Sequence, residues 1–196
     1  MRRALLASAI AVAFVAAAAP SSVLAQQPAA AAPAGPAVGD VAPDFTVTGV
    51  TKDGVLAAPV RLADLRGQTV VVAFFPKART SGCTVQMESY RDRYADLFNG
   101  GEGVTLLAVS TDQTTDLEAW AKEANFPMTF GSDVDGSMGK LFGANRGAVN
   151  DRSLFVIGPD GKIAYIARPF RQMAEEAYTD LGAAIDRVAT KKVGVQ

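Results

Sequence analysis

The chain has 196 residues, with 19 basic and 20 acidic side chains and a formal net charge of −1. This balance provides no strong field to hold nucleic acid or anionic lipid, so nucleic-acid binding is not expected. There is one cysteine and no histidine. That composition excludes an intramolecular disulfide, a Cys-x-x-Cys redox pair and a triad built on imidazole, and it leaves too few ligands for structural zinc. We expect no metal and no other cofactor.

The N-terminus has the pattern of an export signal. Two arginines precede an apolar stretch over residues 4–19, and small residues before Gln26 permit cleavage. We therefore expect a signal peptide over residues 1–25 and a periplasmic or secreted mature protein. An uncleaved membrane anchor is the alternative interpretation.

The composition changes after the signal. Residues 26–39 are rich in alanine and proline without periodicity, which predicts a flexible tether. One folded domain is expected over residues 40–192, a normal domain size. A lone thiol exported to an oxidising compartment suggests that Cys83 has a chemical role, although a small buried apolar residue would look the same at this stage.

The first half of the domain predicts a strand–helix–strand unit. Residues 70–75 are a continuous apolar, β-branched run ended by Pro76, as in a strand buried on both faces. Apolar side chains over residues 83–97 recur at spacings of four and three, which predicts a helix closed by residues 99–101. A second apolar run, residues 104–109, completes the unit. Its right-handed crossover makes the two strands parallel neighbours.

A second helix is expected next. Residues 115–118 match a capping box that opens a helix through Ala124, which ends before Pro127. The stretch that follows is rich in turn residues, and Asp133–Gly136 is interpreted as a turn because the other ligands of a calcium loop are missing.

The last elements are a hairpin and a helix. Residues 154–157 and 163–167 are β-rich and flank a turn sequence at 158–161, which predicts an antiparallel pair. Residues 174–188 place apolar side chains on one helical face. The order β-α-β-α-β-β-α predicts an α/β protein of the thioredoxin-like fold, with a central mixed β-sheet flanked by helices.

Cys83 falls in the first turn of the predicted helix, at the carboxyl edge of the sheet, where sites in α/β proteins tend to lie. Unpaired backbone N–H groups and the positive end of the helix dipole favour a thiolate there. With histidine absent, arginine must supply any further activation. Thr80, three residues earlier, is expected to cap the helix, to hold a bound oxygen atom, or to do both.

The segment Pro76-x-x-x-Thr80-x-x-Cys83 resembles the active-site element of the peroxiredoxins, the alkyl hydroperoxide reductase and thiol-specific antioxidant family. The resemblance is closest to the bacterioferritin-comigratory type, in a one-cysteine variant. It extends through residues 42–45 and 152–157 and covers essentially the whole domain. It implies a thioredoxin-like fold and a thiol-dependent peroxidase.

The resemblance also implies roles for individual residues. In this family the cysteine is the peroxidatic nucleophile, the threonine aligns the peroxide and the proline shields the pocket, which are Cys83, Thr80 and Pro76 here. Arg152 matches the arginine that stabilises the thiolate and the developing charge. Without the resemblance Arg152 would be interpreted as a solvated strand-end residue.

The implied reaction reduces hydrogen peroxide or organic hydroperoxides through a cysteine sulfenic acid. Many members of the subgroup carry a second, resolving cysteine at the position of Glu88. Its loss implies an external thiol reductant: thioredoxin-like, glutaredoxin-like or a small thiol. The family commonly forms dimers, so a homodimer and a monomer both remain open. Arg79, at a position that is commonly acidic, is expected in solvent.

The alternative hypothesis is a non-catalytic thioredoxin-like module that binds a partner or senses peroxide. The joint presence of Thr80, Cys83 and Arg152 argues against it, because a binding module has no reason to gather these groups around one sulfur.

Overall fold

The computed structural model describes residues 35–189. The predicted signal peptide, most of the predicted tether and residues 190–192 of the predicted domain lie outside this range. The last residues expected in the tether, 35–39, are described, and the Gly39 N–H donates to the Ile163 carbonyl at 2.8 Å. Within residues 35–189, no helix is long and apolar enough to cross a membrane.

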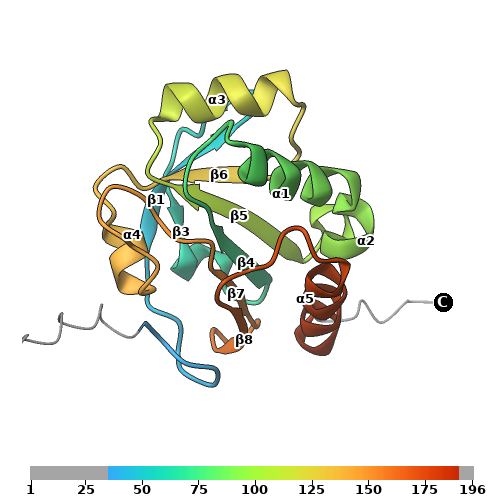
Figure 1. Ribbon diagram of the computed structural model, residues 1–196. Helices are drawn as coiled ribbons and strands as arrows, with labels where there is room; N and C mark the ends of the chain where they lie inside the picture. Colours follow the sequence, from blue (N-terminus) through green and yellow to red (C-terminus); the bar gives the residue numbers. More distant parts are fainter. Residues whose placement is uncertain (1–34, 190–196) are drawn as a thin grey trace, which may run out of the picture. The chain divides into compact units, whose positions relative to one another are not determined.

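The centre of the fold is an eight-stranded mixed sheet with the order β2-β1-β6-β5-β4-β7-β8, in which β3 pairs with β1 (Figure 1). Strands β4, β5 and β6 are parallel, whereas β7 runs antiparallel to β4. The strands are β1 (Thr46–Thr51), β2 (Gly54–Val55), β3 (Val60–Arg61), β4 (Thr69–Phe74), β5 (Val104–Ser110), β6 (Thr129–Ser132), β7 (Leu154–Ile157) and β8 (Ile163–Ala167).

Helices cover the sheet on both faces (Figure 1). Because successive side chains of a strand point to opposite faces, Val71 and Ala73 of β4 pack with residues of α1, α3 and α5, whereas Val72 and Phe74 pack with residues of α4 and the first 3₁₀ turn. The helices are α1 (Ser81–Asp92), α2 (Tyr94–Phe98), α3 (Thr114–Glu123), α4 (Ser137–Leu141) and α5 (Glu175–Val188), with 3₁₀ turns η1 (Leu62–Leu65) and η2 (Asn99–Gly101).

The structure confirms the thioredoxin-like α/β architecture and all seven predicted elements, with bounds that shift by only a few residues except in the first helix. That helix is broken: α1 ends at Asp92 and α2 begins at Tyr94, because Arg93 leaves the helical region with φ −109° and ψ 15°. Apolar periodicity continues across the break, so the sequence pattern does not reveal it.

One predicted feature is wrong, and five short elements were not predicted. The predicted capping box does not form: Gln113 is the N-cap of α3, and no side chain caps it. Strands β1, β2, β3 and β6 and helix α4 were not predicted. These elements span two to six residues, and β1 and β6 each contain a glycine, so their periodicity is too short to detect.

Candidate active site

Cys83 is placed by the junction of β4 and α1. All six residues of β4 are buried, and the chain leaves the sheet after Phe74 through a short loop. Thr80 is the N-cap of α1, with extended backbone angles, and Cys83 is the third residue of the helix. The Cys83 side chain is fully buried. The thiol therefore lies in the first helical turn, at the carboxyl edge of the sheet, as predicted.

Arg152 reaches Cys83 because β7 is antiparallel to β4. Ala73 pairs with Leu154, and the Phe74 N–H donates to the Ser153 carbonyl at 2.8 Å. Arg152, the residue before Ser153, therefore lies at the end of β4 from which the loop leads to α1. The Arg152 Nη2 donates to the Cys83 Sγ across 3.3 Å. A guanidinium in this position can stabilise negative charge that develops at the sulfur during a reaction.

A chain of hydrogen bonds behind Arg152 fixes its orientation. The Arg152 Nη1 donates to the Gln86 Oε1, and the Gln86 Nε2 donates to the Tyr90 hydroxyl at 2.9 Å. Gln86 and Tyr90 are both fully buried. Burial raises the pKa of Tyr90 far above its ordinary value, so its hydroxyl stays neutral over the working pH range.

The sequence analysis did not identify Gln86 or Tyr90 as part of the site. The one available signal was a glutamine three residues after Cys83, which places it near the thiol on a helix.

Thr80 and Pro76 lie in the loop between β4 and α1. The Thr80 side chain makes no capping bond; instead its hydroxyl donates to the Lys77 carbonyl at 2.9 Å. The capping alternative is therefore wrong for this side chain. A hydroxyl that donates its hydrogen still offers lone pairs to a bound ligand. Pro76 is half-buried in the same loop.

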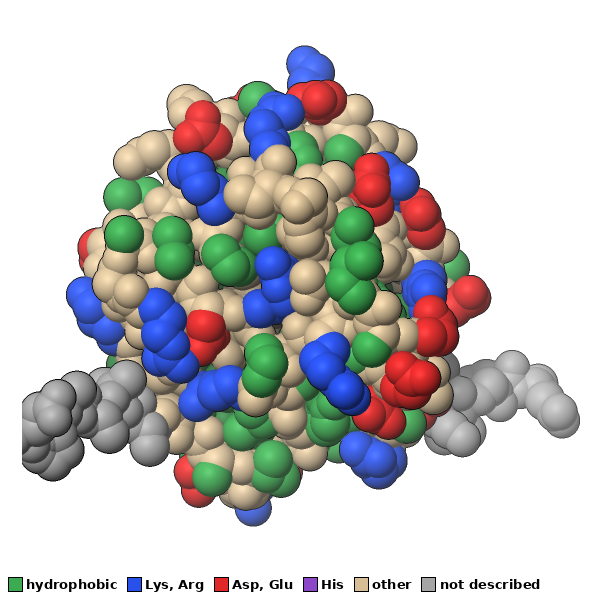
Figure 2. Space-filling model, viewed as in Figure 1, with side chains coloured by type: hydrophobic (Ala, Val, Ile, Leu, Met, Phe, Trp, Pro, Cys, Tyr) green, Lys and Arg blue, Asp and Glu red, His purple; other side chains and the backbone are tan. Residues whose placement is uncertain are grey.

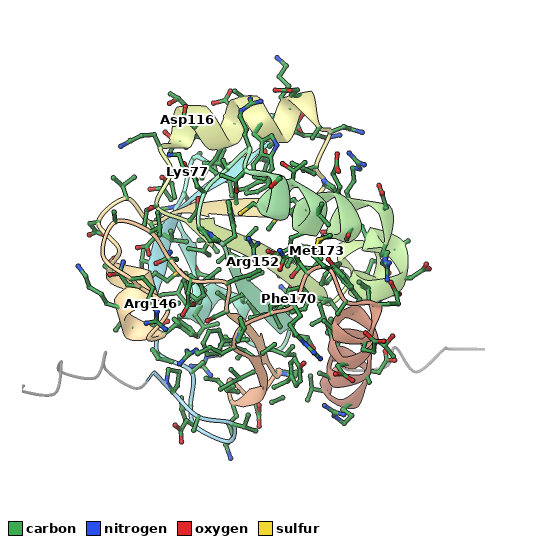
Figure 3. The ribbon with its side chains drawn as sticks, in the orientation of Figure 1. Lys77, Asp116, Arg146, Arg152, Phe170 and Met173 are labelled. Carbon is green, nitrogen blue, oxygen red and sulfur yellow. The ribbon has the colours of Figure 1, made fainter. Side chains whose placement is uncertain are left out.

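The loop that follows β8 closes the site on the side of Arg152. The Phe170 N–H donates to the Arg152 carbonyl at 2.7 Å. A Cβ atom added at Gly82 would lie 2.9 Å from the Gln172 Nε2 and 3.4 Å from the Arg152 Nη2, so both side chains lie close to the start of α1. Figure 3 shows Arg152 in the middle of this face with Phe170 and Met173 beside it. Figure 2 shows the same face of the molecule in space-filling form, with lysine and arginine side chains at the centre and at the rim of that face.

Arg79 is exposed to solvent, as expected. It has a φ of 64°, in the left-handed region that non-glycine residues rarely adopt, and its guanidinium forms an ion pair with Glu123 of α3. This contact borders a depression of about 440 Å³ between α1 and α3, which Glu88 also lines.

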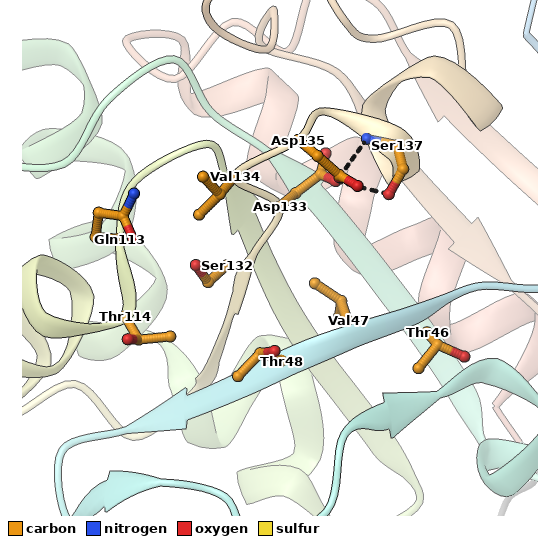
Figure 4. A pocket seen from close by; sticks show the side chains of 10 residues that line it. All are labelled: Thr46, Val47, Thr48, Gln113, Thr114, Ser132, Asp133, Val134, Asp135 and Ser137. Carbon is orange, nitrogen blue, oxygen red and sulfur yellow. Dashed lines mark hydrogen bonds between the residues drawn. The ribbon is translucent and has the colours of Figure 1, made fainter.

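A second depression, of about 420 Å³, is lined by residues of β1 and β6 and by the N-terminal ends of α3 and α4 with the segments before them (Figure 4). Its buried Asp133 accepts the Met138 and Gly139 N–H groups at 2.9 and 2.8 Å and so begins α4. The Ser137 N–H, donating to Asp135, lowers the pKa of that carboxyl. These contacts make the segment a turn, as predicted. Among residues 35–189, no group of three or more His, Cys, Asp or Glu is arranged to hold a metal ion.

Known proteins are similar to this chain in sequence and in fold. A profile of the AhpC/TSA family matches residues 38–166. Peroxiredoxin Bcp of Escherichia coli (strain K12) is 36% identical over 141 residues, which are 68% of this chain and 86% of that protein. The structure of peroxidoxin BcpB from Mycobacterium tuberculosis has a TM-score of 0.66 and 25% identity, covering 78% of this chain and 98% of that one. The Xanthomonas campestris bacterioferritin comigratory protein, described for its alkyl peroxide reduction activity, has a TM-score of 0.63 and 19% identity, over 74% and 92% of the two chains.

The mixed sheet, with a buried cysteine in the first turn of a helix at its edge, defines a thioredoxin-like protein with a single cysteine. The chain belongs to the AhpC/TSA family. The predicted enzyme class, a thiol-dependent peroxidase, is confirmed by the family match and by the Escherichia coli peroxiredoxin.

Proposed function

We propose that Cys83 is the peroxidatic residue and that Arg152, Thr80 and Pro76 complete its site. The observation that carries this proposal is the 3.3 Å contact between the Arg152 Nη2 and the Cys83 Sγ. A guanidinium held by Gln86 and aimed at a buried sulfur has little structural purpose unless that sulfur carries charge.

In the proposed reaction the Cys83 thiolate attacks the terminal oxygen of a hydroperoxide. The S–O bond forms as the O–O bond breaks, and the leaving alkoxide or hydroxide takes a proton to become alcohol or water. Thr80 accepts a hydrogen bond from the bound peroxide, and Arg152 stabilises charge as it moves from sulfur to oxygen. Pro76 limits the access of water to the pocket. The product at Cys83 is a sulfenic acid.

An external thiol then completes the cycle. Its sulfur attacks the Cys83 sulfenic acid to give a mixed disulfide and water, and a second thiol releases Cys83 and leaves as a disulfide. Glu88, in place of a resolving cysteine, provides no sulfur for an internal step. Candidate reductants are a thioredoxin-like protein, a glutaredoxin-like protein or a small thiol.

The proposal also covers the substrates, the location and the oligomeric state of the protein. The substrates are hydrogen peroxide and organic hydroperoxides, in keeping with the alkyl peroxide reduction described for the Xanthomonas campestris relative. The protein acts in the periplasm or outside the cell, on the strength of the N-terminal pattern. A homodimer is the oligomeric state to test first.

The test is the second-order rate of hydrogen peroxide with reduced protein, followed by dimedone trapping and intact-mass analysis. We expect a rate far above that of free cysteine and a single dimedone adduct at Cys83. Cys83→Ser protein is the control and should gain no adduct. A rate no better than free cysteine would overturn the proposal and favour a thioredoxin-like binding or sensing module.

A further inference from the structure

Asp112 is a buried carboxylate that the proposed reaction does not use. It lies just after β5, and its side chain is 5% exposed. An unpaired carboxylate in such a place would be costly, so its hydrogen bonds indicate what it does.

The Asp112 carboxylate binds the loop that carries the site. Its Oδ2 accepts the Ala78 N–H at 2.8 Å and the Ser110 hydroxyl at 2.9 Å. Its Oδ1 accepts the ammonium of Lys77 at 3.3 Å. The Ser132 hydroxyl at the end of β6 donates to the Asp112 carbonyl at 2.8 Å. Asp112 is therefore fixed to the ends of two central strands and, through Ala78 and Lys77, to the loop.

One peptide group connects this carboxylate to Thr80. The Ala78 N–H and the Lys77 carbonyl belong to the same planar peptide unit, so their orientations are coupled. Asp112 accepts the N–H of that unit, and the Thr80 hydroxyl donates to its carbonyl at 2.9 Å. If the plane turned, Thr80 would lose its acceptor.

We propose that Asp112 is a positioning residue that holds the Lys77–Ala78 peptide plane and thereby aims the Thr80 hydroxyl at the peroxide. The inference rests on the proposed function, because it concerns the peroxide step at Cys83. Arg152 contacts Cys83 from the β7 side, through contacts that do not involve this loop. The loss of Asp112 should therefore change substrate alignment and leave the thiolate intact.

A double-mutant cycle with Thr80 tests the inference. We expect Asp112→Ala to slow sulfenic acid formation about tenfold in otherwise native protein, which corresponds to about 1.4 kcal/mol of barrier. In a Thr80→Val background the same change should have no further effect, because the hydroxyl it positions is gone. An equal loss in both backgrounds would show that Asp112 acts independently of Thr80 and would overturn the proposal.

Two further variants and an alkylation measurement distinguish a positioning role of Asp112 from a general effect on the stability of the protein. Asp112→Asn keeps an oxygen to accept the Ala78 N–H, so we expect it to restore the rate to within about threefold of native protein. Thr111→Val is the matched control: it removes the neighbouring hydroxyl, which donates to the Ala148 carbonyl and not to Asp112, and should react like native protein. Iodoacetamide should alkylate Cys83 at the native rate in Asp112→Ala protein. Slower alkylation of Asp112→Ala protein, or a tenfold loss in Thr111→Val, would contradict the inference.

The outcomes also separate this inference from the proposed function. If native protein reacts no faster than free cysteine, the peroxidatic assignment of Cys83 fails. If native protein reacts fast and Asp112→Ala is equally fast, only the assignment of Asp112 fails.

Discussion

At the scale of residues, the site is a line of contacts that runs from the sulfur into the core. Cys83, Arg152, Gln86 and Tyr90 each contact the next, and three of the four side chains are fully buried. The guanidinium has one nitrogen on the sulfur and another on the Gln86 oxygen. Arginine suits this place because its planar fork serves two acceptors in fixed directions, which lysine cannot do.

Arg152→Met should test the cation directly. The change keeps much of the side-chain volume but removes the charge, and we expect the peroxide rate to fall about 100-fold, the usual cost of losing one preorganised donor. Arg168→Met is the matched control, because Arg168 donates to the Phe142 carbonyl and not to Cys83. Stopped-flow kinetics with hydrogen peroxide measures both. Equal losses in the two variants would contradict a specific role for Arg152.

At the scale of elements, α1, the loop before it and Arg152 together bury the sulfur. Cys83 has no exposed surface, and the first turn is held through the Thr84 N–H, which donates to the Thr80 carbonyl at 2.8 Å. A peroxide is small, whereas a reductant must bring a whole thiol group to the same atom. A mixed disulfide at Cys83 therefore needs part of this cover to open, and we expect the first turn of α1 to be displaced.

Hydrogen exchange should reveal that displacement. In protein carrying a small thiol as a mixed disulfide on Cys83, amides of residues 78–88 should exchange at least about tenfold faster than in reduced protein, because their helical bonds open. Peptides over β5, residues 104–110, serve as the internal reference and should not change. Unchanged protection over residues 78–88 would mean that the thiol enters by another route.

At the scale of the whole molecule, aromatic side chains connect the site to the core. Tyr90 packs against Phe98, Phe170 and Tyr178 with ring centroids 5.5 to 6.1 Å apart. The chain has four tyrosines, and burial is the main cause that raises the pKa of each: Tyr90, Tyr94, Tyr165 and Tyr178. The folded protein thus keeps phenolic protons that the unfolded chain releases above about pH 10.

Stability should therefore fall as pH rises above about 10. The unfolded state binds fewer protons than the folded state in that range, and the free energy of unfolding decreases with pH whenever this is so. Urea midpoints measured from about pH 8 to about pH 11 should be level at first and then decline. Tyr90→Phe should make the decline shallower, because its phenyl ring cannot ionise. A profile that stays level to about pH 11 would contradict the expectation.

Much of the fold could be predicted because its patterns are local. The run of β-branched residues in β4, the periodicity of α1 and α5 and the turn between β7 and β8 each depend on neighbours in the chain. The short strands β1 to β3 were missed because pairing with other strands, rather than their own periodicity, forms them.

The sequence alone determined that Cys83 lies at the start of a helix that follows a buried strand. Both the burial of the strand and the face of the helix that is apolar depend on residues adjacent in the chain. Tertiary structure decided which groups meet the sulfur and its loop. Arg152 lies 69 residues from Cys83 in the chain, and Asp112 lies 34 residues from Ala78. Both contacts depend on the register of β7 and β5 against β4. That register joins strands far apart in the chain, so it depends on how the patterns of several segments fit together and cannot be read from one segment alone.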